Sequence, residues 1–138
     1  MGMYTEFHFN AALKDNAPNS VIEILEFMLG DSAERPELPA HLLFQSDRWE
    51  WMLRCDSYYF DADTHSTLKY DEVSKQYYLC IRCNLKNYND EIEKFILWIM
   101  PYLDKHPGDF LGFSRYEETE KPTLIFMERQ GQGSGEEA

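Results

Sequence analysis

Alternating apolar and polar residues predict strands in several stretches of the chain. Near the N-terminus, Phe7, Phe9, Ala11 and Leu13 alternate with Glu6, His8, Asn10 and Ala12. A period of two is typical of a strand with one buried and one polar face. The same alternation predicts a long strand over 76–86 and shorter strands over 66–70, 110–116 and 123–127, the last two forming a closing hairpin.

The segment 48–60 also alternates. Its two sides would be Trp49, Trp51, Leu53 and Cys55 on one hand and Glu50, Met52, Arg54 and Asp56 on the other. We therefore expect a long strand here, with both tryptophans pointing into the core. Trp98 is expected in the core as well, because amphipathic spacing accounts for it without a ligand.

Helical spacing predicts two helices. In the first, Pro18 suits the first turn and Gly30 the C-terminal end, with Val21, Ile22, Leu25, Met28 and Leu29 on one face. In the second, Asn89 is expected as the N-cap, and the apolar run continues through Leu103. Pro101 is expected to kink its last turn. The stretch 31–47 between the first helix and segment 48–60 is expected to be a long, locally packed connection.

The order of these elements predicts an α+β fold. We expect an antiparallel sheet of five or six strands with two helices packed on one face, related to the split-βαβ or ferredoxin-like plan. Residues 1–129 would form a single domain. Residues 130–138, rich in glycine and glutamine, have nothing to bury and are expected to be a disordered tail.

Charge and composition narrow the function classes. The 138 residues carry a formal net charge of −12, and such a field repels phosphate backbones, which argues against direct binding to nucleic acid. No apolar stretch reaches the roughly 20 residues that span a bilayer. Three cysteines without a secretion signal indicate reduced thiols, so we expect a cytoplasmic protein with no membrane contact.

The motif Cys80-Ile-Arg-Cys83 has the spacing of redox and zinc sites. It lies inside a predicted strand, however, where residues three apart point to opposite faces. We therefore interpret it as one core cysteine and one cysteine on the other face.

A weak metal motif lies in the predicted turn after the segment 48–60. Asp61, Asp63 and His65 alternate there, and oxygen and nitrogen ligands of this kind can hold a divalent cation. Aspartates also favour turns for their local hydrogen bonds, and that interpretation is preferred. The sequence also lacks the glycine motifs of a phosphate-binding loop and the Gly-x-Ser-x-Gly motif of a nucleophile elbow. We therefore predict neither a metal nor a cofactor.

The polar face of the predicted sheet is the candidate ligand-binding site. Strand parity places His8, Arg54, Asp56, Tyr58, Tyr78, Arg82 and Asn84 on it, together with Asn10 and Glu50. Arginine there can grip a carboxylate or a phosphate. An ordinary solvated sheet face is the simpler interpretation of the same pattern.

Three hypotheses for function remain. The preferred one is a non-catalytic binding or regulatory module, whose partner is a protein with a basic surface; in this class an acidic mimic of nucleic acid is a further option. The second is a small hydrolase or ligand-binding domain for an anionic substrate, using His8, Arg54, Asp56 and Arg82. The third is a homodimer that pairs through its sheet face or an edge, with Met52, Tyr58 and Tyr78 as anchors.

Overall fold

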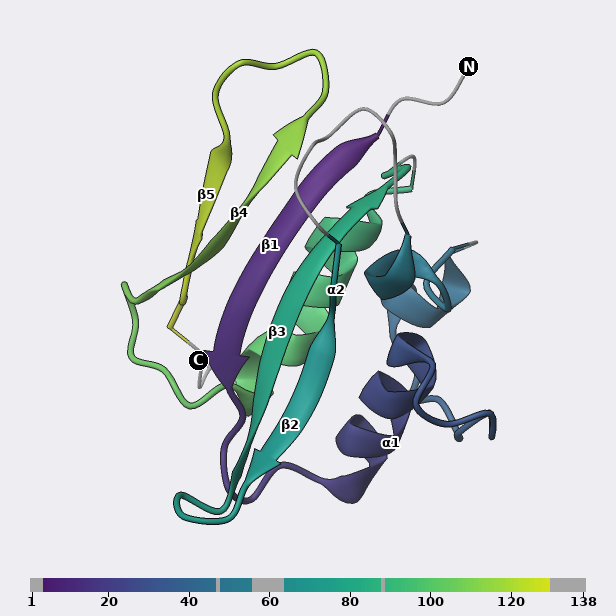
Figure 1. The fold of residues 1–138 in the computed structure, drawn as a ribbon, viewed down its shortest axis with the longest axis vertical. Coiled ribbons are helices and arrows are strands. Elements are labelled where there is room, and N and C mark those ends of the chain that lie inside the picture. Colours follow the sequence, from purple (N-terminus) through teal and green to yellow (C-terminus); the bar gives the residue numbers. More distant parts are fainter. Residues whose placement is uncertain (1–3, 47, 56–63, 88, 130–138) are drawn as a thin grey trace.

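The computed structural model describes residues 4–46, 48–55, 64–87 and 89–129 (Figure 1). Its elements are β1 (Thr5–Ala12), α1 (Asn19–Leu29), the short 3-10 helices η1 (Leu42–Gln45) and η2 (Met52–Arg54), β2 (Thr67–Asp71), β3 (Gln76–Leu85), α2 (Glu91–Ile99), the 3-10 turn η3 (Met100–Tyr102), β4 (Phe110–Tyr116) and β5 (Thr123–Phe126). The strands predicted near the N-terminus, at 66–70, at 76–86 and in the closing hairpin are confirmed, and so is the α+β class.

The five strands form one sheet in the order β2-β3-β1-β4-β5. Every neighbouring pair is antiparallel. β1 is therefore the central strand, although it comes first in the chain, and β2 and β5 are the two edges. Figure 1 shows the sheet as a twisted layer with α2 behind β1 and β3 and with α1 beyond β2.

The core lies on the side of the sheet that α2 covers. Phe7 and Phe9 of β1 are fully buried, and Phe95 of α2 packs edge-on against both rings, with 6.1 Å between centroids in each pair. Of the residues predicted for the core side of β3, Leu79, Ile81, Cys83 and Leu85 are buried, whereas Tyr77 is only half-buried. The period-two pattern thus identified the buried face of both central strands.

The first helix forms as its spacing predicted. All five of its expected core residues are buried. Gly30 follows it with a φ of 83°, and its N–H donates to the carbonyls of Glu26 and Phe27. Glycine suits this position because other residues adopt such a left-handed conformation only at a cost.

The predicted strand over 48–60 is wrong for the residues that the structure describes. Residues 48–51 form a turn and Met52–Arg54 form η2, while 56–60 lie outside the described part of the chain. Trp49 is 3% exposed, but Trp51 is 56% exposed, so only one of the two points inward. The buried residues here are Trp49, Met52 and Leu53, which have the spacing of a helical turn.

The second helix starts and stops slightly differently from the prediction. Asp90, not Asn89, is the N-cap, with a φ of 56°. The α-helix ends at Ile99, and the chain continues as the 3-10 turn η3 with Pro101 at its start. Proline cannot donate a helical hydrogen bond, which explains the change of geometry at this point. Trp98 is buried, as expected.

The predicted disordered tail, residues 130–138, lies outside the described residues. Neither α1 nor α2 has the length and apolar content of a helix that crosses a bilayer, and the rest of the described chain offers no other candidate.

Candidate functional site

Arg54 and Arg82 do not share the open face of the sheet. Arg82 lies on β3 and is exposed, whereas Arg54 belongs to η2 and not to any strand. The Arg54 Nε donates to the carbonyl of Met28 over 3.0 Å, and one of its terminal nitrogens donates to the carbonyl of Glu50 over 3.3 Å. The placement of Arg54 on the sheet was therefore wrong, because the strand that would have carried it does not form.

The other residues predicted on the open face have mixed outcomes. Tyr78 is exposed and donates from its hydroxyl to Ser74 Oγ at 3.3 Å. Asn84 has the predicted parity but is buried, which the expectation of a solvated face did not include. Asp56 and Tyr58 lie outside the described residues.

His8 does lie on the open face, in a cluster that the sequence did not reveal. Its Nε2 is 3.1 Å from Oε2 of the buried Glu6, and the other oxygen of Glu6 accepts from Arg115 Nε at 3.3 Å. The His8 ring also stacks on Phe113, with centroids 4.7 Å apart. Glu6 and His8 are two residues apart on one strand and so share a face, which the sequence could show, but Arg115 and Phe113 join them only through the pairing of β1 with β4, which it could not.

This cluster orients an imidazole with a carboxylate, which is one requirement of acid–base chemistry. Glu6 is nevertheless shared with a guanidinium, and Phe113 covers one face of the ring. Both oxygens of the Glu6 carboxylate have a cationic or polar partner within the chain. These contacts are enough to explain why the carboxylate is buried, so the cluster needs no ligand.

The two weak metal candidates Asp61 and Asp63 lie outside the described residues, and His65 is exposed just before β2. Within the described parts of the chain, no three histidine, cysteine or acidic side chains are close enough together to hold a metal ion.

The cysteines match the interpretation from strand parity. Cys80 and Cys83 are both free, with Cys83 buried and Cys80 half-buried. Burial raises the pKa of the Cys83 thiol well above its usual range, and burial also raises the pKa of Cys55. Raised pKa values keep thiols protonated and unreactive, so these residues behave as core groups.

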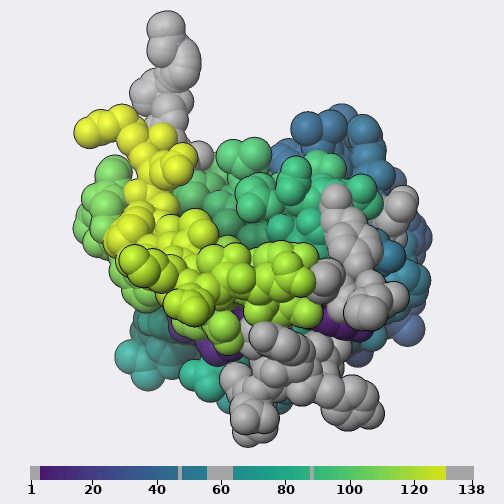
Figure 2. All heavy atoms as spheres, turned by 90° about the horizontal axis from the view of Figure 1, so that it is seen from above, coloured from purple at the N-terminus to yellow at the C-terminus, as the bar shows by residue number. Residues whose placement is uncertain are grey.

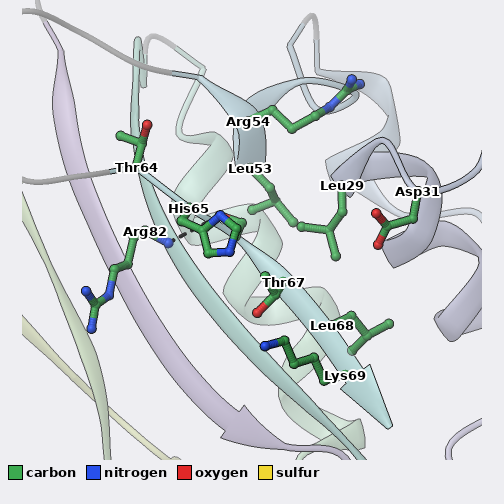
Figure 3. Close-up of a pocket in the computed structure, with 11 residues that line it drawn as sticks. Leu29, Asp31, Leu53, Arg54, Thr64, His65, Thr67, Leu68, Lys69 and Arg82 are labelled. Atoms are coloured by element: carbon green, nitrogen blue, oxygen red, sulfur yellow. Dashed lines mark hydrogen bonds between the residues drawn. The ribbon is translucent and has the colours of Figure 1, made fainter.

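A groove beside the edge strand β2 brings several of the predicted residues together. Its volume is about 510 Å³, within the range of ligand pockets. It is lined by Leu29, Asp31, Leu53, Arg54, Thr64, His65, Ser66, Thr67, Leu68, Lys69 and Arg82. The groove thus has one wall from β2 and the residues before it, and another from η2 and the end of α1 (Figure 3).

The wall formed by residues 64–69 is an outer edge of the sheet, with which no other described strand pairs. The N–H of His65 donates to the carbonyl of Arg82 at 2.8 Å, and the register continues with Thr67 opposite Cys80 and Lys69 opposite Tyr78. Main-chain groups alternate in direction along a strand, so those of Ser66 and Leu68 point away from β3, toward the groove.

The floor of the groove is apolar and its rim is charged with both signs. Figure 3 shows Leu29, Leu53 and Leu68 directed into the space between β2 and α1, with Asp31 on the helix side. Lys69 lies on the strand side. The guanidinium groups of Arg54 and Arg82 point in opposite directions, away from the centre, so the groove does not clamp an anion between two arginines.

Comparison of the chain with protein-family models, with curated proteins and with solved structures found no match in any of the three. The geometry of the groove therefore carries the functional argument.

Proposed function

We propose that this chain is a peptide-binding module, in which an extended segment of a partner protein lies in the groove beside β2 and pairs with that strand. One observation carries the proposal: no described strand pairs with the outer edge of β2, and that edge borders a groove of about 510 Å³. Addition of a strand to an open sheet edge beside a helix is a recurrent mode of peptide recognition.

Main-chain hydrogen bonds would supply most of the affinity. The groove follows six consecutive residues, Thr64 to Lys69, a length of roughly 20 Å in extended conformation. Within the described chain, Ser66 and Leu68 donate no main-chain hydrogen bond outside the pairing of β2 with β3. Their N–H and C=O groups are positioned to pair with a ligand strand.

Side chains would supply the specificity. Alternate residues of an extended ligand point down and up, so an apolar residue can reach Leu29 and Leu53 while its neighbours face the rim. The rim carries Asp31 and Lys69, which favours a ligand with charges of both signs. The net charge of −12 favours a basic partner protein, because attraction at long range accelerates encounter.

The fold supports this arrangement. The element order β-α-β-β-α-β and the neighbours β2-β3-β1-β4 fit the ferredoxin-like plan, with β5 as an addition. We propose that both helices belong to one layer, since residues of α1 and α2 contribute to the same core. In that plan the end of α1 faces the edge of β2, which leaves room for one more strand.

The test uses a displayed library of random linear peptides as the probe, followed by calorimetry on the peptides it selects. Ser66→Pro removes the N–H that points into the groove, at the first position before β2, where proline is tolerated. Ser66→Ala is the matched control, because it removes only the hydroxyl that accepts from the N–H of Arg82. We expect the proline variant to weaken binding by roughly tenfold or more and the alanine variant to bind like the wild type.

Circular dichroism of both variants shows whether the fold is retained. Selected peptides that bind the folded proline variant as tightly as the wild type would contradict the proposal, as would peptides whose amide chemical-shift changes map away from residues 64–69.

A further inference from the structure

A second pocket, of about 300 Å³, lies beside the first turn of α2, at the end of the sheet where β1 begins. Most of the residues that line it carry a hydroxyl group, and these are Thr5, Ser114, Tyr116, Thr119 and Thr123. A pocket with several converging polar groups is suited to a ligand that can form several hydrogen bonds.

The hydroxyl groups stand on the helix side of the sheet, where the neighbouring residues are apolar. Ser114 of β4 pairs with Phe7 of β1 and with Thr123 of β5, and residues paired in this way share a face. Thr5 is two residues from Phe7 on the same strand and is buried too. The face that carries the aromatic core therefore becomes polar at this end.

The pocket also contains a carboxylate and an ammonium group, from Glu93 and Lys121. Asn87 holds the carboxylate, because its Nδ2 donates to Glu93 Oε1 at 3.4 Å while its Oδ1 accepts from the N–H of Ile92 at 2.9 Å. An anionic ligand would be repelled by Glu93 and a cationic one by Lys121. A hydroxyl group both donates and accepts, so an uncharged ligand with several hydroxyl groups suits all of these partners.

The polar pocket continues into an apolar groove of about 450 Å³ between α2 and β5, since Glu93, Ser114 and Thr123 line both spaces. In Figure 2, β4, β5 and the loop between them, coloured light green to yellow, form one continuous outer band of the molecule, and this band is the sheet-side wall of both spaces. The groove follows α2 for roughly 10 Å, the length of an alkyl chain of about eight carbons. Its apolar lining includes Ile96, Leu97, Met100 and Ile125.

We propose that the joined spaces bind a single-chain amphiphile whose head is a sugar ring. The head lies in the hydroxyl-lined pocket, and the alkyl chain runs along the groove and covers Leu97, which is 64% exposed. Tyr116 is exposed in the pocket wall and offers its ring to the apolar C–H face of the sugar. A wholly apolar ligand would instead leave the polar groups of the pocket without partners. The site lies on the other side of the sheet from the β2 groove and goes beyond the peptide-binding function.

Calorimetry with three uncharged probes tests this assignment: octyl glucoside below its critical micelle concentration, octanol as the tail alone, and glucose as the head alone. We expect octyl glucoside to bind at least roughly tenfold more tightly than either of the others, because only it fills both spaces. Its amide chemical-shift changes should map to the first turns of α2 and to residues 114–125.

Two variants separate the head from the tail. Thr123→Val keeps the branched side chain but removes its hydroxyl, so it should weaken octyl glucoside by roughly fivefold and leave octanol unchanged. Leu97→Gln should weaken both octyl glucoside and octanol and leave glucose unchanged. Both residues are exposed, so neither substitution disturbs the core. Val73→Gln, in the exposed turn between β2 and β3, is the control and should bind all three probes like the wild type.

Octyl glucoside that does not bind, or that binds no more tightly than octanol, would overturn the proposal. So would a Thr123→Val variant that binds octyl glucoside like the wild type, or chemical-shift changes that map away from the two spaces. Because none of these variants touches the β2 groove, the peptide selection remains a separate test.

Discussion

Arg54 reaches from η2 to the last turn of α1, where its Nε donates to the carbonyl of Met28 over 3.0 Å. The final carbonyls of a helix lack partners within the helix, so a guanidinium at this position satisfies one of them. The same side chain packs over Gly30, whose ideal Cβ position lies 3.1 Å from one of its nitrogens. Arg54 thus joins the loop after α1 to the helix itself.

We expect Arg54→Ala to lower the free energy of unfolding by about 1–2 kcal/mol, because it removes hydrogen bonds to two main-chain carbonyls. Arg54→Lys should restore only part of the loss, since a lysine cannot donate in two directions from a planar group. Urea denaturation followed by fluorescence measures both. An alanine variant as stable as the wild type would show that water replaces the arginine without cost.

Gly112 of β4 is required by the close approach of β1. A Cβ at this position would lie 1.9 Å from the carbonyl oxygen of His8. Gly112→Ala should therefore destabilise the fold by about 3 kcal/mol or more, because the two strands must separate. Gly108→Ala is the matched control: its φ is 93°, but nothing lies within 4 Å of the new methyl group, so about 1–2 kcal/mol of backbone strain is expected. Thermal melts of the two variants should rank in that order, and the reverse order would contradict the register of β1 and β4.

Cys83 should make the fold less stable in alkaline solution. Its burial raises the pKa of the folded state well above the ordinary value of 9.0. Above pH 9.0 the unfolded chain loses the thiol proton while the folded chain keeps it, so the stability contributed by this group is lost as pH rises. The slope is at most about 1.4 kcal/mol per pH unit for one thiol.

Cys83→Val removes the titrating group and keeps the site apolar, and only the slope of stability against pH is compared, because valine is larger than cysteine. Denaturation curves from about pH 7 to about pH 10 should show a shallower loss of stability for the variant than for the wild type. Parallel curves over this range would mean that Cys83 titrates normally in the folded state.

Lys75 occupies a strained position in the turn between β2 and β3. Its φ is 60°, and its N–H donates to the carbonyl of Asp71 at 2.7 Å. Lys75→Gly should raise the free energy of unfolding by about 1 kcal/mol, because glycine adopts this conformation without steric cost. Lys75→Ala keeps the strain and should leave the stability nearly unchanged. A glycine variant with a lower melting temperature than the alanine variant would refute the argument.

The regular elements were predictable because their patterns are unambiguous. The alternation in β1 and β3 and the helical spacing in α1 all reflect a single buried face. The segment 48–55 failed because its residues satisfy two periods at once: Trp49 and Leu53 fit a strand, but Trp49, Met52 and Leu53 fit a turn of helix. Packing of η2 against β3 and α1 decides between the two periods, and those contacts are not visible in a local pattern.

The candidate sites were less predictable than the fold. His8 was placed on the open face by parity alone, but its partner Glu6 is shared with Arg115, which is distant in sequence. The groove beside β2 depends on where α1 ends relative to the sheet edge, which is a matter of tertiary packing. Three residues named from the sequence line this groove, Arg54, His65 and Arg82. His65 and Arg82 are neighbours in it because the His65 N–H donates to the Arg82 carbonyl.

The central position of β1 has a consequence for folding. Its neighbours β3 and β4 come much later in the chain, so that Phe7 pairs with Cys83 on one side and with Ser114 on the other. Contacts between residues so distant in sequence close long loops and slow the search for the native state. As the chain leaves the ribosome, the apolar side of β1 therefore waits until nearly the whole sheet has been synthesised, and a chaperone that holds this first strand should raise the yield of folded protein.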